Sequence, residues 1–171
     1  ACPQNHILWL LAIRLEQELC GAAKARSVLD MARSSLPSNE YVLREGSRLE
    51  RRAAYSASAS TSSSSSTGLS GGEGGGSHST NAHQVADSLL AVALQKLPLS
   101  PVLWAEYVLY APKQQQKMRS VDALKKCDSA PLVITAVARL FLRDGKLDKA
   151  RKWLSRAVSI DADCGDSWIA L

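Results

Sequence analysis

The chain has 171 residues and a net charge of +5, with 46% hydrophobic, 22% charged and 5% aromatic residues. This length allows one domain or a part of a larger one. It contains no run of about 18 apolar residues, so we expect no membrane span and no signal peptide. Cys2, Cys20, Cys127 and Cys164 lie far apart, which argues against a disulfide scaffold or a zinc site and fits a reducing compartment.

The first predicted element is an amphipathic helix near the N-terminus. Five apolar side chains recur there at helical spacing: Ile7, Leu8, Leu11, Leu15 and Leu19. Gly21 predicts its end. Further along, Ser100 and Pro101 are typical of an N-cap followed by the first helical residue, and Asp144-Gly145 predicts a tight turn between helices. No stretch alternates apolar and polar residues for long enough to predict a strand.

Proline and tryptophan spacing indicates an internal repeat. Four pairs of residues are each separated by six positions: Pro3 and Trp9, Pro37 and Leu43, Pro98 and Trp104, Ala162 and Trp168. The 34 residues from Pro3 to Pro37 match the length of a helix–turn–helix repeat. A second pattern occurs twice, as Ala25, Leu29, Ala32, Leu36 and Pro37 and as Ala86, Leu90, Ala93, Leu97 and Pro98, and in part at Ala150, Leu154 and Ala157.

These patterns predict an all-α fold, an α-solenoid of stacked helical hairpins of the tetratricopeptide type, with one disordered Ser/Gly-rich insert. Residues 1–55 hold the first repeat and the first helix of the second. Residues 56–82 form the insert, because the second repeat is 27 residues longer than the first and this tract offers almost no side chain to bury. Residues 83–171 complete the second repeat.

The last of these segments is expected to hold further repeats. We place a third over 101–128, a fourth over 131–160 and the start of a fifth at about Asp163. The recurring residues are interpreted as packing positions, since stacked hairpins share one continuous core. They are Trp9, Glu16, Ala25, Ala32, Pro37, Glu50, Ala86, Ala93, Pro98, Trp104, Ala150, Ala157 and Trp168.

The sequence offers no catalytic, cofactor or metal site. His6, His78 and His83 have no cysteine or carboxylate at ligand spacing. There is no Gly-x-Ser-x-Gly elbow, and the glycine run 71–76 lacks the Lys-Ser/Thr of a phosphate loop. We therefore expect a protein that is not an enzyme and has no cofactor or small-molecule substrate.

Positive charge concentrates in one stretch. Residues 113–156 contain 12 basic and 4 acidic side chains. The stretch is compatible with an acidic protein partner, with direct contact with RNA phosphates, or with a solvated helix face, which is the commonest origin of such a stretch. Within it, Lys149, Lys152 and Arg156 recur on one helix face and are possible partner-binding residues.

The repeat pattern resembles the half-a-tetratricopeptide (HAT) repeat of RNA-processing scaffolds. Segments 119–127, 136–141, 149–153 and 165–168 are similar to the C-terminal repeats of the pre-mRNA-processing factor 6 family. The resemblance implies a nuclear, non-catalytic scaffold that bridges snRNP proteins of the spliceosomal tri-snRNP and is part of a longer chain. Two alternatives stay open: a direct RNA-binding module using 113–156, and a HAT-repeat scaffold of RNA 3′-end processing.

Overall fold

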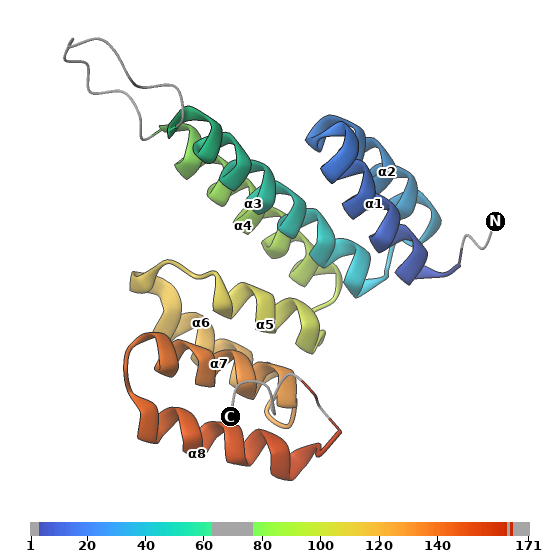
Figure 1. The fold of residues 1–171 in the computed structure, drawn as a ribbon. Helices are drawn as coiled ribbons and strands as arrows, with labels where there is room; N and C mark the ends of the chain where they lie inside the picture. The colour runs from blue at the N-terminus through green and yellow to red at the C-terminus, as the bar shows by residue number, and fades with distance from the viewer. Residues whose placement is uncertain (1–3, 63–76, 164, 166–171) are drawn as a thin grey trace, which may run out of the picture. The chain divides into compact units, whose positions relative to one another are not determined.

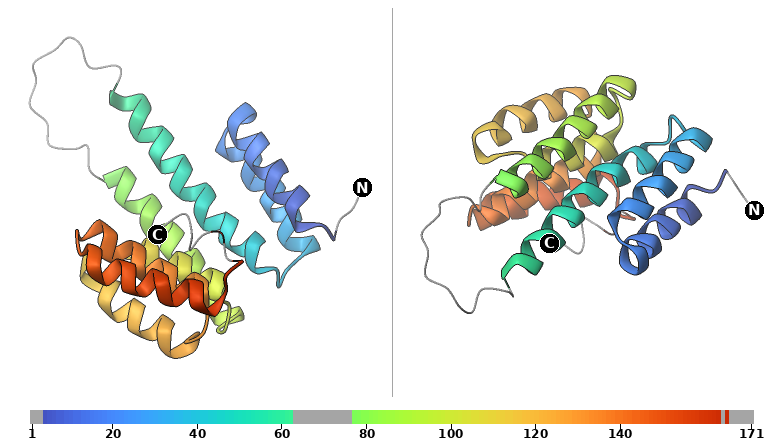
Figure 2. Two further views of the ribbon diagram at one scale, coloured as in Figure 1. Left: turned by 60° about the horizontal axis from the view of Figure 1, so that its bottom comes forward. Right: turned by 90° about the horizontal axis from the view of Figure 1, so that it is seen from above.

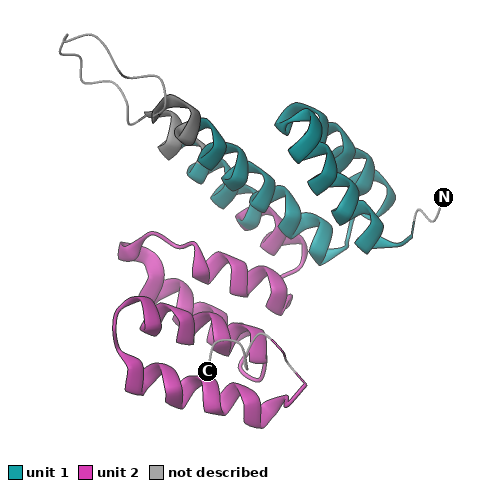
Figure 3. Ribbon diagram, viewed as in Figure 1, with its two compact units in different colours: residues 1–90 teal, residues 91–171 magenta. Residues whose placement is uncertain are grey.

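The computed structural model describes residues 4–62, 77–163 and 165, and the regular structure in these residues is all helical (Figure 1). The helices are α1 (His6–Cys20), α2 (Ala22–Ser35), α3 (Glu40–Ser62), α4 (Ser77–Lys96), α5 (Pro101–Leu109), α6 (Lys113–Lys126), α7 (Pro131–Arg143) and α8 (Leu147–Ile160). The chain divides into two compact units, residues 1–90 and 91–171 (Figure 3). The expected all-α class, built from packed helical hairpins, is confirmed.

The first unit begins with the α1–α2 hairpin, whose helices lie side by side in both views of Figure 2. Asn5 caps α1, because its Oδ1 accepts a hydrogen bond of 3.0 Å from the Ile7 amide. Gly21 alone separates the helices, and its φ of 85° lies in the left-handed region that glycine adopts without strain. The predicted helix end at Gly21 is therefore confirmed.

The apolar stripe that predicted α1 is exposed. Ile7, Leu8, Leu11, Leu15 and Leu19 are each 50–73% accessible to solvent. The buried residue of this helix is Ile13, and Trp9 is half-buried beside it. The stripe is exposed because α2 and α3 cover the face of α1 that carries Ile13. On that face, Ala25, Leu29 and Leu49 pack around Ile13. The periodicity predicted the helix correctly but not its buried side.

Helix extends into both ends of the predicted Ser/Gly-rich insert. α3 continues to Ser62 and α4 begins at Ser77, although disorder was expected over 56–82. Alanines in the first of these ends, and the absence of glycine and proline there, favour helix. The remainder, 63–76, lies outside the described residues. The three-part division of the chain stays a prediction, and the boundary between the compact units falls within α4 instead.

The second unit contains the hairpins α5–α6 and α7–α8, which occupy the segments assigned to the third and fourth repeats. Ser100 Oγ accepts a 3.3 Å hydrogen bond from the Leu103 amide and Pro101 opens α5, as expected from the sequence. The turn at Asp144 and Gly145 is also confirmed, with a φ of 74° at the glycine. The expected fifth repeat begins at the edge of the described residues, and Trp168 lies outside them.

Candidate partner-binding groove

Helix α7 forms the centre of the second unit. It packs against α5, α6 and α8, and seven of its thirteen residues are buried. Val133, Val137 and Leu140 join Val108 of α5 and Ala123 of α6 in the core. Helices α6 and α8 both lie against α7, and in the described part of the chain they do not contact each other. A channel is therefore left between them, with α7 as its floor.

This channel is a groove of about 550 Å³, which we call the α6–α8 groove. Its apolar floor and walls consist of Val121, Leu124, Val137, Leu140, Phe141 and Trp153. The rings of Phe141 and Trp153 are 6.2 Å apart and tilted by 39°, and both are half-buried. The groove therefore offers aromatic and aliphatic surface that the packing of the unit leaves partly open.

Lysines dominate the charge at this groove. Lys113 and Lys117 come from α6, Lys149 comes from α8, and Lys146 precedes that helix. Lys146 makes an ion pair of 3.4 Å with Asp144, the one acidic residue that lines the groove. The other three lysines are exposed and have no ion pair to a described residue. The rim thus carries positive charge that no described residue neutralises.

Other basic residues of the stretch 113–156 have structural partners. Arg119 is buried, and its guanidinium lies 3.8 Å from the ring centroid of Tyr107, tying α6 to α5. Arg156 lies over Trp153 at 5.8 Å and pairs with Asp128 at 3.6 Å. The basic stretch is therefore not a single uninterrupted surface.

The structure separates the three proposed partner-binding residues. Lys149 lines the groove, while Lys152 is exposed on α8 and does not line it. Arg156 touches the Trp153 ring one turn further along. Phe141 and Trp153 were not predicted as groove residues, because aromatic residues at helical spacing are typical of a core. The signal that could have found Trp153 is its position four residues after Lys149, on the same helix face.

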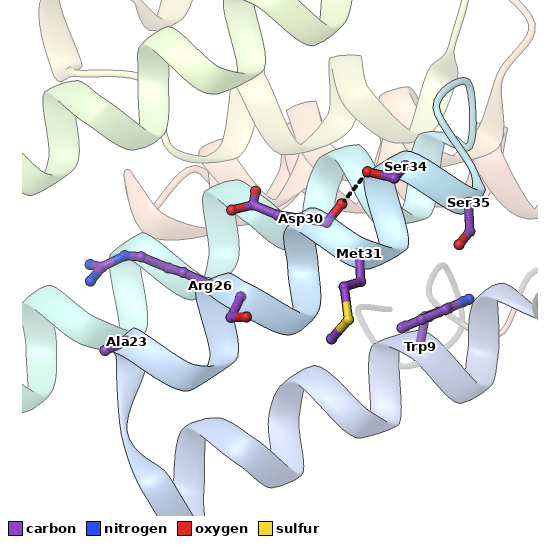
Figure 4. Close-up of a pocket in the computed structure, with 8 residues that line it drawn as sticks. Trp9, Ala23, Arg26, Asp30, Met31, Ser34 and Ser35 are labelled. Atoms are coloured by element: carbon purple, nitrogen blue, oxygen red, sulfur yellow. Dashed lines mark hydrogen bonds between the residues drawn. The ribbon is translucent and has the colours of Figure 1, made fainter.

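A second depression lies on the first unit, along α2 and beside Trp9 of α1 (Figure 4). It encloses about 810 Å³ and is wide open to solvent. Met31 and Trp9 point into the space between the two helices, and the Ser34 hydroxyl donates to the Asp30 carbonyl at 2.9 Å. Arg26 turns toward Glu50 of α3, where two hydrogen bonds of 2.8 Å raise the pKa of the guanidinium. These polar groups are occupied within the unit, so the depression presents little free charge.

The residues interpreted as packing positions are placed as follows. Ala25, Ala32, Ala86, Ala93, Ala150 and Ala157 are buried, Trp9, Glu16, Glu50 and Trp104 are half-buried, and Pro37 and Pro98 are exposed. The Trp104 indole N–H donates a 2.8 Å hydrogen bond to the Pro98 carbonyl, six residues earlier. This bond gives a direct physical reason for the six-residue spacing of Pro98 and Trp104.

Two cysteines are described, and their surroundings differ. Cys20 is exposed at the end of α1, whereas Cys127 is half-buried and its thiol donates to the Leu99 carbonyl at 3.5 Å. Burial raises the pKa of the Cys127 thiol. In the part of the chain that the structure describes, no cluster of His, Cys, Asp and Glu could hold a metal ion, and no helix could span a membrane.

Comparison with known proteins places these hairpins among splicing factors. Over 167 residues the chain is 34% identical to pre-mRNA-splicing factor prp1 of Schizosaccharomyces pombe, covering 98% of the chain and 15% of that relative. The chain is homologous to a segment of this splicing factor. Pre-mRNA-processing factor 6 of Homo sapiens is 52% identical over 56 residues, which are 33% of the chain and 6% of that protein.

The same homology reaches plants. Protein STABILIZED1 of Arabidopsis thaliana is 52% identical over 58 residues, covering 34% of the chain and 6% of that protein. No family model matches the chain. Since 98% of the chain aligns with prp1, the homology extends over both compact units, and the resemblance to the pre-mRNA-processing factor 6 family is confirmed. The chain nevertheless spans only a small part of each relative's length.

Proposed function

We propose that the chain acts in pre-mRNA splicing in the nucleus, as a non-catalytic scaffold that bridges protein components of the spliceosomal tri-snRNP. The relationship to pre-mRNA-splicing factor prp1 and pre-mRNA-processing factor 6 supports the splicing role and favours it over RNA 3′-end processing. Stacked helical hairpins support a scaffold, since they expose broad surfaces on which partners can dock.

One observation favours protein binding over catalysis or small-molecule binding. The α6–α8 groove combines partly open aromatic and aliphatic side chains with lysines that lack partners among the described residues. Protein interfaces commonly have such an apolar centre and a charged rim. The partner-binding role of Lys149, Lys152 and Arg156 belongs to this proposal: Lys149 lines the groove, Arg156 lies over the Trp153 ring that lines it, and Lys152 is exposed on the same helix.

Affinity purification of the chain from nuclear extract, followed by mass spectrometry, tests the proposal. We expect proteins of the tri-snRNP to be enriched after nuclease treatment. Reversing the charge of Lys149, Lys152 and Arg156 to glutamate should reduce their recovery. If no spliceosomal protein is recovered with the wild-type chain, the scaffold proposal is wrong.

Direct RNA binding is the second candidate function, favoured by the 12 basic residues of 113–156. Its support is weakened because Arg119 and Arg156 already contact aromatic rings and acidic or polar groups within the unit. An RNA-binding module would show affinity that falls steeply with salt, owing to counterion release. Filter binding of a single-stranded RNA across a salt series distinguishes the two functions.

A further inference from the structure

We propose that the α6–α8 groove binds a short extended segment of a partner protein in which acidic side chains flank an apolar or aromatic residue. The inference rests on the proposed scaffold function and names the chemistry of the partner. It follows from three properties of the groove: its floor, its length and the charge on its rim.

The floor suits an apolar anchor. Phe141 and Trp153 leave part of their rings open, and Val121 remains 44% exposed although it is a large apolar side chain. An inserted Phe or Leu would bury this surface together with its own, and a Phe ring would also contact the two aromatic rings. The half-buried pair of rings is therefore a natural position for the anchor residue of a peptide.

The length of the groove suits a peptide rather than a folded domain. Its lining on α6 runs from Lys113 to Leu124, a distance of about 17 Å at 1.5 Å per residue. An extended chain advances about 3.3 Å per residue, so about five residues fill it.

The rim selects the charge of that peptide. Lys113 and Lys117 line the groove from α6 and Lys149 lines it from α8, and no described acidic residue pairs with them. Asp144 is already paired with Lys146. Carboxylates on either side of the anchor would meet these lysines, whereas a basic or neutral segment would leave the lysines unpaired.

Peptide binding to the full chain tests the inference by fluorescence polarisation. The probe is a fluorescein-labelled peptide with a central Phe-Leu pair flanked on both sides by glutamates. Two control peptides replace the glutamates by glutamines or the Phe-Leu pair by serines. The groove variant is Lys117→Glu with Lys149→Glu, and the matched control is Lys126→Glu with Arg151→Glu. The matched control reverses one basic residue on each of the same two helices, outside the groove.

We expect the groove variant to weaken binding of the acidic peptide about tenfold, the matched control to leave it unchanged, and both control peptides to bind more weakly. Val121→Ser, at a partly exposed position that should not disturb the fold, should also weaken binding. Equal binding by both double variants would overturn the inference. Binding of an oligouridylate that only the groove variant abolishes, with no peptide binding, would also overturn it in favour of RNA.

The affinity purification distinguishes a failure of this inference from a failure of the proposed function. If spliceosomal proteins are recovered equally with wild type and the groove variant, the scaffold role stands and the assigned groove is wrong. If none is recovered while the peptide still binds the groove, the groove chemistry stands and the splicing role fails.

Discussion

The two units bury different kinds of side chain on their central helices. In the first unit, α3 packs on α1 and α2 and buries Glu45 and Ser47 among its apolar residues. In the second unit, α7 packs on three helices and buries aliphatic residues and alanines, with Thr135 as its one buried polar residue. Helical hairpins of similar length therefore support either a polar or an apolar centre.

The buried carboxylate of this polar centre has one partner on its own helix, α3, and one on α1. Glu45 is fully buried, and its Oε1 accepts from Arg52 at 2.6 Å and from Arg14 of α1 at 3.4 Å. Gln17 of α1 accepts a 2.8 Å hydrogen bond from the same Arg52. The network thus joins α1 to α3 through charged and amide side chains.

The largest expected effect comes from breaking the apolar centre of the second unit. Trp104→Ala should destabilise that unit by about 3–5 kcal/mol, because the indole packs on the α5–α7 core and its N–H bonds to the Pro98 carbonyl. Urea unfolding followed by circular dichroism measures the loss. Trp104→Phe keeps a ring but no N–H donor, so it should lose less. A loss below about 1 kcal/mol for the alanine variant would show that the core does not depend on this residue.

The polar centre of the first unit should be less sensitive. Glu45→Ala removes the acceptor of two arginine contacts, and we expect a loss of about 2 kcal/mol. The loss is limited because Arg14 and Arg52 are 50% and 38% exposed, so water can solvate them after the change. Glu16→Ala is the matched control, a half-buried carboxylate on α1, and should change stability by less than about 0.5 kcal/mol.

Hydrogen exchange shows in which helices each of these two variants loses stability. Glu45→Ala should speed exchange in α1 and α3, and Trp104→Ala should speed it in α5 and α7. Global acceleration by either variant would mean that the two units unfold as one.

The sequence predicted helix positions better than helix faces. Pro101 and Pro131 each open a helix at the first helical position, so α5 and α7 begin where the repeat spacing placed them. The buried side of α1 could not be predicted, because its five exposed aliphatic residues form a more regular stripe than the single buried Ile13. The groove was missed for a related reason, since Phe141 and Trp153 match a core pattern and only the separation of α6 from α8 opens them.

Substitutions in the exposed stripe of α1 should have only a small effect on stability. Leu11→Ser with Leu15→Ser should change the free energy of unfolding by no more than about 0.5 kcal/mol per site, because both side chains are more than half exposed. Ile13→Ala on the same helix should lose about 2–5 kcal/mol, because it is fully buried. The reverse order in thermal unfolding would mean that the leucine face is the buried one.

The smallest expected effect is a difference in chemical reactivity. It compares the alkylation rates of one thiol from each unit, Cys20 and Cys127. At a fixed pH near 8, iodoacetamide should modify Cys20 faster than Cys127, because only the thiolate reacts and burial raises the pKa of the Cys127 thiol. Since the native state retains the Cys127 proton, the difference should shrink as the pH rises through that raised pKa, and it should vanish in urea, where both thiols are solvated. Mass spectrometry of tryptic peptides measures the two rates in the same sample. Faster modification of Cys127 in the native chain would mean that the contact between its thiol and the Leu99 carbonyl opens readily, and that the start of α5 is less firmly held against the end of α6 than the 3.5 Å bond indicates.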